Sequence, residues 1–180
     1  MEQVTEEQRN QASVIDELVS NAEKHHASFD RGHLPIRPAR KLAILACMDS
    51  RMDIFGMLGL SEGDAHVIRN AGGVVTDDSI RSIAISQRRL GTESIVLVHH
   101  TDCGMQMGTD EDFKRSIRED VGVTPTWSVE FFDDLDEDVR ESIARIKSNP
   151  FIPNRDDVRG FVYEVETGRL REVEERPRPG

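Results

Sequence analysis

Short, uninterrupted apolar runs alternate along this chain with longer segments in which apolar residues recur every three or four positions. LAILAC (Leu42–Cys47) and SIVLVHH (Ser94–His100) have the length and composition of strands that are covered on both faces of a parallel sheet. A weaker strand is predicted over Ala65–Arg69, and a helix over Thr76–Leu90, with Gly91 directly after its end. This order predicts an α/β fold with a mostly parallel sheet, in which sites form at the carboxyl edge of the strands.

Further elements are predicted on both sides of these strands. Apolar residues spaced by threes and fours predict an N-terminal helix from Glu6 to Phe29, and two prolines predict an extended connector over His33–Arg40. Downstream, the pattern predicts helices over Asp110–Glu119 and Asp134–Lys147, flanking the central sheet. Residues 160–174, GFVYEVETGRLREVE, are predicted to form a hairpin.

The length of the chain favours one domain. A chain of 180 residues can bury a continuous core without disulfides, so we expect a single domain over residues 1–180. Within it, residues 1–40 are predicted to form a helical arm and connector, residues 41–175 the α/β core, and residues 176–180 a frayed tail.

The charge of the chain limits its partners. The formal net charge is −11 at pH 7, and the clustered Lys and Arg that bind nucleic acid or anionic membranes are missing from the sequence. No apolar run approaches the roughly 18 residues of a membrane span, and the opening MEQVTEEQRN is too polar for a signal peptide. We therefore expect a cytoplasmic protein without a nucleic-acid or membrane partner.

Cysteine and histidine stand at the ends of the two strongest predicted strands. Cys47 ends the first strand, and His100 ends the other, three residues before Cys103. Two thiolates and an imidazole are typical zinc ligands, and three protein ligands with an open fourth position are typical of catalytic zinc. Two alternatives are weaker. Free cysteines are often buried as small apolar residues, and a redox pair would favour a Cys-x-x-Cys spacing, which is absent.

Two other histidines are weighed against this site. His99 could replace His100 as a ligand, but only His100 gives the His-x-x-Cys spacing, and successive strand residues face opposite ways. His66 is predicted to be a structural or interface histidine.

Asp49 and Arg51 follow Cys47 closely and point the same way if this segment is extended. An ion pair would keep Asp49 ionised and aimed, either to accept a hydrogen bond from zinc-bound hydroxide or to take the fourth metal position itself. The alternative is an ordinary polar turn that caps a helix beginning near Met52.

The motifs Cys47-x-Asp49-x-Arg51 and His100-x-x-Cys103 resemble the signature of the β-class carbonic anhydrases. The stretch RNAGG, residues 69–73, resembles that family's conserved loop after the second strand. The likeness is to the short bacterial branch of the family, near members that hydrolyse carbonyl sulfide.

This resemblance implies a fold, an activity and a partner. The fold is a core of four parallel strands with an added edge strand, and an N-terminal helix that reaches across a partner in a dimer or a multiple of dimers. The activity is reversible hydration of carbon dioxide to bicarbonate by zinc-bound hydroxide, with Asp49 and Arg51 as the orienting dyad. The residues expected to line or position the substrate pocket are Ala71, Gly72, Gly73 and Gly104.

In the commoner family pattern a glycine and a small residue follow the second zinc cysteine, whereas here Cys103-Gly104 is followed by Met105 and Gln106. The pocket lining is therefore altered, and carbonyl sulfide hydrolysis at the same zinc site is a second hypothesis. A third is a non-catalytic zinc-binding domain in which Asp49 permanently closes the metal site.

Overall fold

The computed structural model describes residues 13–175. Its elements, in chain order, are α2 (Val14–Ala27), β1 (Leu42–Cys47), α3 (Ile54–Leu58), β2 (Ala65–Asn70), the 3-10 turn η1 (Ala71–Gly73), α4 (Asp77–Leu90), β3 (Ser94–His100), the 3-10 turn η2 (Gly104–Gln106), α5 (Asp110–Val121), α6 (Leu135–Ser148), β4 (Val158–Tyr163) and β5 (Leu170–Val173).

The chain divides into two compact units. Helix α2 lies in the first, which ends at Leu34, and all other elements lie in the second, which begins at Pro35. The predicted start of the N-terminal helix at Glu6 and the predicted tail at residues 176–180 fall outside the described residues. The single-domain organisation stays a prediction.

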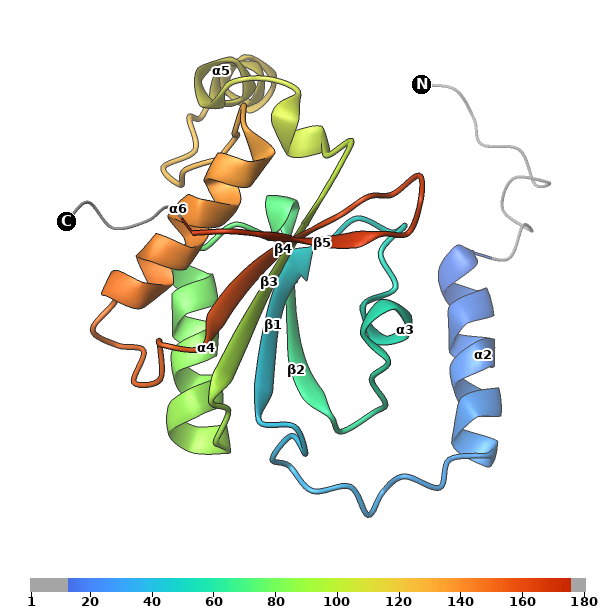
Figure 1. Cartoon of the computed structure of the whole chain (residues 1–180). Helices are drawn as coiled ribbons and strands as arrows, with labels where there is room; N and C mark the ends of the chain where they lie inside the picture. Colours follow the sequence, from blue (N-terminus) through green and yellow to red (C-terminus); the bar gives the residue numbers. More distant parts are fainter. Residues whose placement is uncertain (1–12, 176–180) are drawn as a thin grey trace, which may run out of the picture. The chain divides into compact units, whose positions relative to one another are not determined.

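The second unit is built on a five-stranded sheet in the order β2-β1-β3-β4-β5. Neighbouring strands from β2 to β4 run parallel, and β5 pairs antiparallel with β4 as the arm of a hairpin. Helices α4 and α6 cover one face of the sheet, and α3 covers the other (Figure 1). The predicted α/β fold, with four parallel strands and one edge strand, is confirmed.

Alternation along β1 explains why its apolar run is continuous. Leu45 packs into the core cluster beneath α4 and α6, whereas Ile44 and Ala46 pack into the cluster on the α3 side. Both faces of β1 are therefore buried, as expected for a central parallel strand. Cys47 and Cys103 belong to the α3-side cluster, which brings this core up to the carboxyl edge of the sheet.

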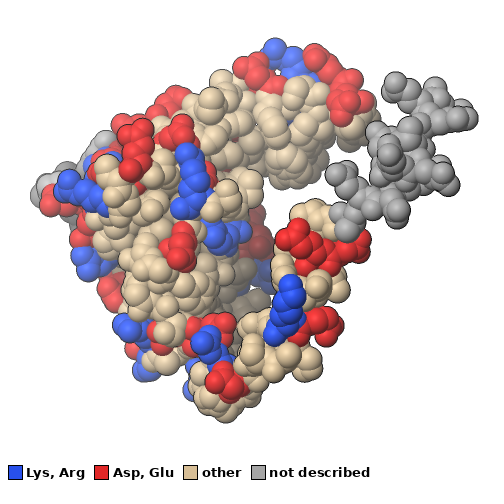
Figure 2. Space-filling model, turned by 90° about the vertical axis from the view of Figure 1, so that its right-hand side faces the viewer, with Lys and Arg blue, Asp and Glu red and all other residues tan. Residues whose placement is uncertain are grey.

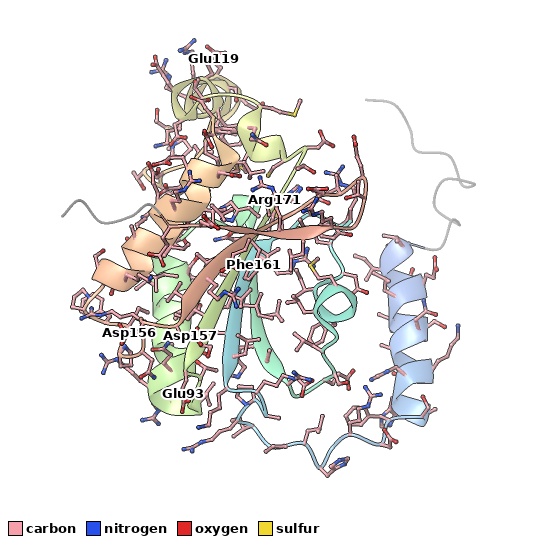
Figure 3. All side chains as sticks on the ribbon, viewed as in Figure 1. Glu93, Glu119, Asp156, Asp157, Phe161 and Arg171 are labelled. Atoms are coloured by element: carbon pink, nitrogen blue, oxygen red, sulfur yellow. The ribbon has the colours of Figure 1, made fainter. Side chains whose placement is uncertain are left out.

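The amino edge of the sheet carries different chemistry. Glu93, Asp156 and Asp157 lie there, just before β3 and β4, and Ile95 N–H donates to the Asp157 carbonyl at 2.9 Å (Figure 3). These acidic residues are at the opposite end of the strands from Cys47 and His100, so they take no part in the site described below.

The surface matches the acidic composition. On the face shown in Figure 2, basic side chains are scattered singly among acidic ones and do not gather into a patch. None of the helices in residues 13–175 is both long and apolar enough to span a membrane.

Candidate metal centre

The strand order brings three candidate ligands together. Cys47 is the last residue of β1 and His100 the last of β3, and these strands are adjacent and parallel, so their carboxyl ends meet. Cys103 follows after a short turn. The ligand atoms of all three residues lie within 4.8 Å of one another, and all three residues are buried. This cluster can hold a metal ion.

The hydrogen bonding of His100 leaves one ring nitrogen available. Nδ1–H donates to the Thr101 carbonyl at 2.8 Å, which assigns the proton to Nδ1. Nε2 is buried and has no hydrogen-bond partner within residues 13–175. A buried polar atom without a partner is costly, and a metal ion would satisfy it.

The two thiols interact directly. Hydrogen bonding from the Cys103 thiol lowers the pKa of Cys47, and the N–H groups of Asp49 and Gly72 lower it further by donating to the Cys47 sulfur. The same contact with Cys47 raises the pKa of Cys103. The pair therefore gives up one proton readily and the second only when a cation compensates the charge. Two thiolates and an imidazole are a donor set that suits zinc.

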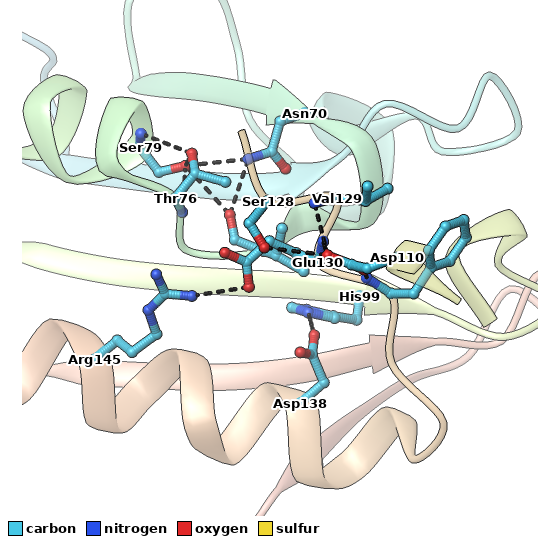
Figure 4. A network of polar contacts seen from close by, with 12 residues as sticks. Asn70, Thr76, Ser79, His99, Asp110, Ser128, Val129, Glu130, Asp138 and Arg145 are labelled. Atoms are coloured by element: carbon cyan, nitrogen blue, oxygen red, sulfur yellow. Dashed lines mark hydrogen bonds and ion pairs between the residues drawn. The ribbon is translucent and has the colours of Figure 1, made fainter. Parts of the chain in front are cut away.

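His99 faces away from this cluster. It is fully buried, its Nε2 pairs with Asp138 Oδ2 at 2.6 Å, and its ring lies 5.9 Å from that of Phe132 (Figure 4). The structure thus brings His100 rather than His99 to the cysteines. His66 lies elsewhere, with Nδ1 2.8 Å from Ser86 Oγ, where it ties β2 to α4.

Asp49 pairs with Arg51, as the two-residue spacing predicts. Arg51 donates from Nε to Asp49 Oδ1 at 2.9 Å and from Nη2 to Oδ2 at 2.8 Å, and its backbone N–H donates to Oδ1 at 2.8 Å. These bonds hold the pKa of Asp49 well below its usual range, so this carboxylate is ionised at neutral pH. Asp49 Oδ2 lies 3.8 Å from His100 Nε2, which places the carboxylate beside the metal cluster.

The helix-capping alternative for Asp49 is wrong. Helix α3 is capped by Asp53, whose side chain accepts from the Gly56 N–H at 3.0 Å. Asp49 instead closes a turn onto Arg51.

Arg69 positions this turn from the neighbouring strand. It donates to the carbonyls of Cys47 at 2.9 Å, Met52 at 3.2 Å and Asp49 at 2.6 Å. In the sequence, Arg69 is notable only as part of the RNAGG stretch. Its role in holding this turn was missed because main-chain carbonyls leave no signal in a sequence. Arg69 fixes the backbone that carries both Cys47 and Asp49.

The glycines of η1 allow the chain to pass close to the metal cluster. Gly73 has φ +74°, and a Cβ there would lie 2.8 Å from the Cys47 nitrogen and 3.1 Å from the Val98 carbonyl oxygen. Gly72 is buried behind Met105. These glycines therefore let the backbone of η1 lie against the strand ends that carry the metal ligands.

A cavity of about 590 Å³ adjoins the cluster. Its wall includes Ala71 and Gly104, whereas Gly72 and Gly73 lie outside the lining. Met48 and Met105, which flank the cysteine segments, also line it. The remaining wall is mainly apolar and includes Val74, Phe113, Trp127, Val129 and Phe131.

One carboxylate holds the far wall of this cavity. Asp110, the first residue of α5, accepts from the backbone N–H groups of Val129 at 2.9 Å and Phe131 at 3.1 Å (Figure 4). It also accepts weaker hydrogen bonds from the Glu130 N–H and from the Ser128 hydroxyl. Asp110 therefore shapes the segment that presents aromatic side chains to the cavity.

Comparisons with known proteins agree on one family. The sequence profile described as carbonic anhydrase matches residues 42–170. The chain is 55% identical over 161 residues to β-carbonic anhydrase 1 of Mycobacterium tuberculosis, covering 89% of this chain and 98% of that protein. It is 33% identical over 180 residues to a carbon disulfide hydrolase of Acidithiobacillus thiooxidans, covering 88% and 90%. The crystal structure of carbonic anhydrase from Streptococcus mutans superposes with a TM-score of 0.84 at 44% identity, covering 90% of this chain and 98% of that one.

Proposed function

This chain is an enzyme of the β-carbonic anhydrase family, a family of lyases, and from that premise we propose that it catalyses the reversible hydration of carbon dioxide. The observation that carries the proposal is the buried convergence of Cys47, His100 and Cys103, with one imidazole nitrogen that has no hydrogen-bond partner among the described residues. These three side chains would hold a zinc ion. Family membership argues against the hypothesis of a non-catalytic zinc-binding domain.

Zinc bound there would act as a Lewis acid that activates water near neutral pH. The protein's own groups prepare the surroundings. The Thr101 carbonyl keeps the His100 proton on Nδ1, and the N–H groups of Asp49 and Gly72 stabilise the Cys47 thiolate. This arrangement keeps His100 Nε2 and the Cys47 sulfur deprotonated where a metal needs them.

Asp49 and Arg51 would orient the attacking water. The Asp49 carboxylate is ionised and lies beside the cluster, so it can accept a hydrogen bond from that water and aim its lone pair at the carbon atom of the substrate. Arg51 fixes the carboxylate plane through its two parallel donors. An apolar cavity beside the site suits a small, linear, uncharged substrate.

Hydrolysis of a sulfur-containing analogue is the second candidate. Relatives named carbon disulfide hydrolases share 33–38% identity with this chain, and the thioethers of Met48 and Met105 line the cavity. Carbonyl sulfide is also linear and apolar, and attack of water on its carbon would release hydrogen sulfide. Turnover of carbon dioxide, carbonyl sulfide and carbon disulfide on one purified sample would rank the three.

The deciding experiment measures zinc content together with carbon dioxide hydration by stopped flow. Wild type is expected to bind about one zinc ion per chain and to hydrate carbon dioxide rapidly, and Cys47→Ala to lose both metal and turnover. Asp49→Asn is expected to retain zinc while turnover falls at least about 100-fold, because an amide pairs poorly with Arg51 and is not a base. Ser50→Ala, at an exposed neighbouring position, is the control.

Each other outcome has a definite meaning. Zinc at one ion per chain with negligible carbon dioxide turnover would overturn carbon dioxide as the substrate and favour carbonyl sulfide. Wild-type protein without zinc would overturn it. Loss of zinc together with unfolding in Asp49→Asn would make Asp49 a structural ligand.

A further inference from the structure

Arg51 is held from two sides, and only one of them is Asp49. Its Nη1 donates to Asp102 Oδ2 at 2.8 Å, and its Nη2 donates to the Asp102 carbonyl oxygen at 3.0 Å. The Nε edge of the guanidinium faces Asp49, and the opposite edge faces Asp102. The planar guanidinium therefore bridges two residues that are 53 positions apart in the chain, from Asp49 to Asp102.

The backbone at Asp102 is unusual and suits this contact. Its φ is +56°, a left-handed value that few non-glycine residues adopt and that Asp tolerates better than most. In this conformation its carboxylate and its own carbonyl both reach Arg51. The preceding residue is anchored, since Thr101 N–H donates to the Tyr163 carbonyl at 3.0 Å and Thr101 Oγ1 accepts from Val165 N–H at 3.1 Å. The backbone at Asp102, two residues after β3 ends, is thus anchored next to Arg51.

Arg51 needs such a fixed point. Its side chain is 45% exposed, and an exposed arginine in a single ion pair retains much of its rotamer freedom. Contacts to two separate segments leave the guanidinium one orientation. The plane of Arg51 in turn sets the plane of the Asp49 carboxylate.

We propose that Asp102 is a positioning residue for the reaction, holding Arg51 in the orientation that aims Asp49 at the metal centre. The role of Asp102 in catalysis rests on the proposed function, whereas the restraint on Arg51 exists whatever the substrate is. Charge alone gives the opposite prediction: a second carboxylate competes for the guanidinium, so removing it would tighten the Asp49–Arg51 pair. The two accounts predict opposite results.

Two substitutions isolate the carboxylate of Asp102. Asp102→Gly retains the left-handed backbone and the carbonyl contact but removes the side chain. Asp102→Asn also tolerates this backbone and retains an oxygen acceptor. Glu111→Gln removes an equally charged carboxylate from an exposed pair with Arg115 on α5 and is the matched control.

The first measurement is hydrogen exchange of the Arg51 Nε–H by nitrogen-15 NMR on the purified full chain, with the signal assigned through Arg51→Lys. Exchange is expected to be slow in wild type, Asp102→Asn and Glu111→Gln, and about tenfold faster in Asp102→Gly, because charge-assisted hydrogen bonds that restrain the guanidinium are lost. Equal or slower exchange in Asp102→Gly overturns the proposal. If that variant does not fold, the exchange rate in wild type provides the test. An Arg51 Nε–H that exchanges as fast as those of solvent-exposed arginines would also overturn the proposal.

The second measurement is steady-state turnover of the same proteins. In Asp102→Gly, kcat is expected to fall about tenfold with KM nearly unchanged, because aim rather than substrate binding is lost, and Asp102→Asn is expected to recover most of it. Unchanged or higher kcat in Asp102→Gly overturns the role in the reaction. If wild type turns over no substrate, the proposed function fails, and the NMR result still tests the restraint on Arg51.

Discussion

At the scale of single residues, the metal centre depends on residue type and also on which atom of each residue its hydrogen bonds leave available to a metal. His100 could present either ring nitrogen, and the Thr101 carbonyl decides between them by accepting from Nδ1–H. The Asp49 side chain could adopt several orientations in its turn, and Arg51 fixes one of them by donating to both carboxylate oxygens. The motif supplies the donors, and local main-chain contacts select the state in which each donor is presented.

Gly73 is the residue whose replacement should damage this centre most without removing a functional group. In Gly73→Ala the new methyl group would press on the backbone of Cys47 and Val98, and φ +74° is strained for alanine. We expect the free energy of unfolding in urea to fall by about 2–4 kcal/mol, from strain and overpacking together.

Gly104→Ala is the matched control for stability. Nothing lies within 4 Å of a Cβ at Gly104, and its φ is not positive. Its free energy of unfolding should stay within about 0.5 kcal/mol of wild type. Equal losses in the two variants would mean that close packing at Gly73 is not what requires glycine there.

At the scale of elements, the sequence predicted what periodicity and burial determine. The bounds of β1 and β3 were predicted correctly because each is a continuous apolar run buried on both faces. Helix α4 begins one residue after the predicted start, because Thr76 is its cap and accepts from the Ser79 N–H. The cysteines and His100 were predicted to meet because parallel strands end at one edge.

The clamp at Asp110 could not be predicted in this way. Its partners are backbone N–H groups about twenty positions away, at Val129 and Phe131, and a backbone donor has no sequence signature. The same reason hid Arg69, which donates to three main-chain carbonyls. Contacts between a side chain and a distant main chain depend on the finished fold.

Asp110→Asn tests this clamp. Burial raises the pKa of Asp110, but the N–H donors of Phe131 and Val129 outweigh it, and the net shift is downward from 3.8. A lowered carboxylate pKa stabilises the fold at all pH values above the unfolded pKa, and this contribution is lost as pH falls below it. At pH 7 we expect Asp110→Asn to lose about 1–2 kcal/mol in urea unfolding and to be cleaved faster by protease between α5 and α6.

The difference between Asp110→Asn and wild type should shrink as the pH falls below 3.8, because Asp110 of the unfolded chain then takes up a proton, whereas folded Asp110 does so only at a lower pH. Glu119→Gln, at an exposed carboxylate near the end of the same helix, should show neither effect (Figure 3). A difference that stays constant down to pH 3 would show that ionised Asp110 is not the stabilising group.

At the scale of the whole molecule, the described part of the first unit, residues 13–34, contains no buried residue. Helix α2 has no buried residue, and Val14, Ile15, Leu18 and Val19 are each more than half exposed on one side of it. A helix of 14 residues is marginal in water, and its stability ordinarily comes from packing an apolar face. We propose that this face is covered by a second copy of the chain, in keeping with the dimer that the family resemblance implies.

This proposal predicts the mass of the protein in solution. By size exclusion with light scattering, wild type should have the mass of two chains of 20.3 kDa or a multiple of that. Leu18→Asp buries a charge in the contact if α2 packs on a partner, so it should shift the mass towards one chain. Ser20→Asp adds the same charge to the opposite side of α2 and should leave the mass unchanged. If Leu18→Asp retains the wild-type mass, the apolar face of α2 is not part of the contact, and a monomeric wild type would remove the dimer altogether.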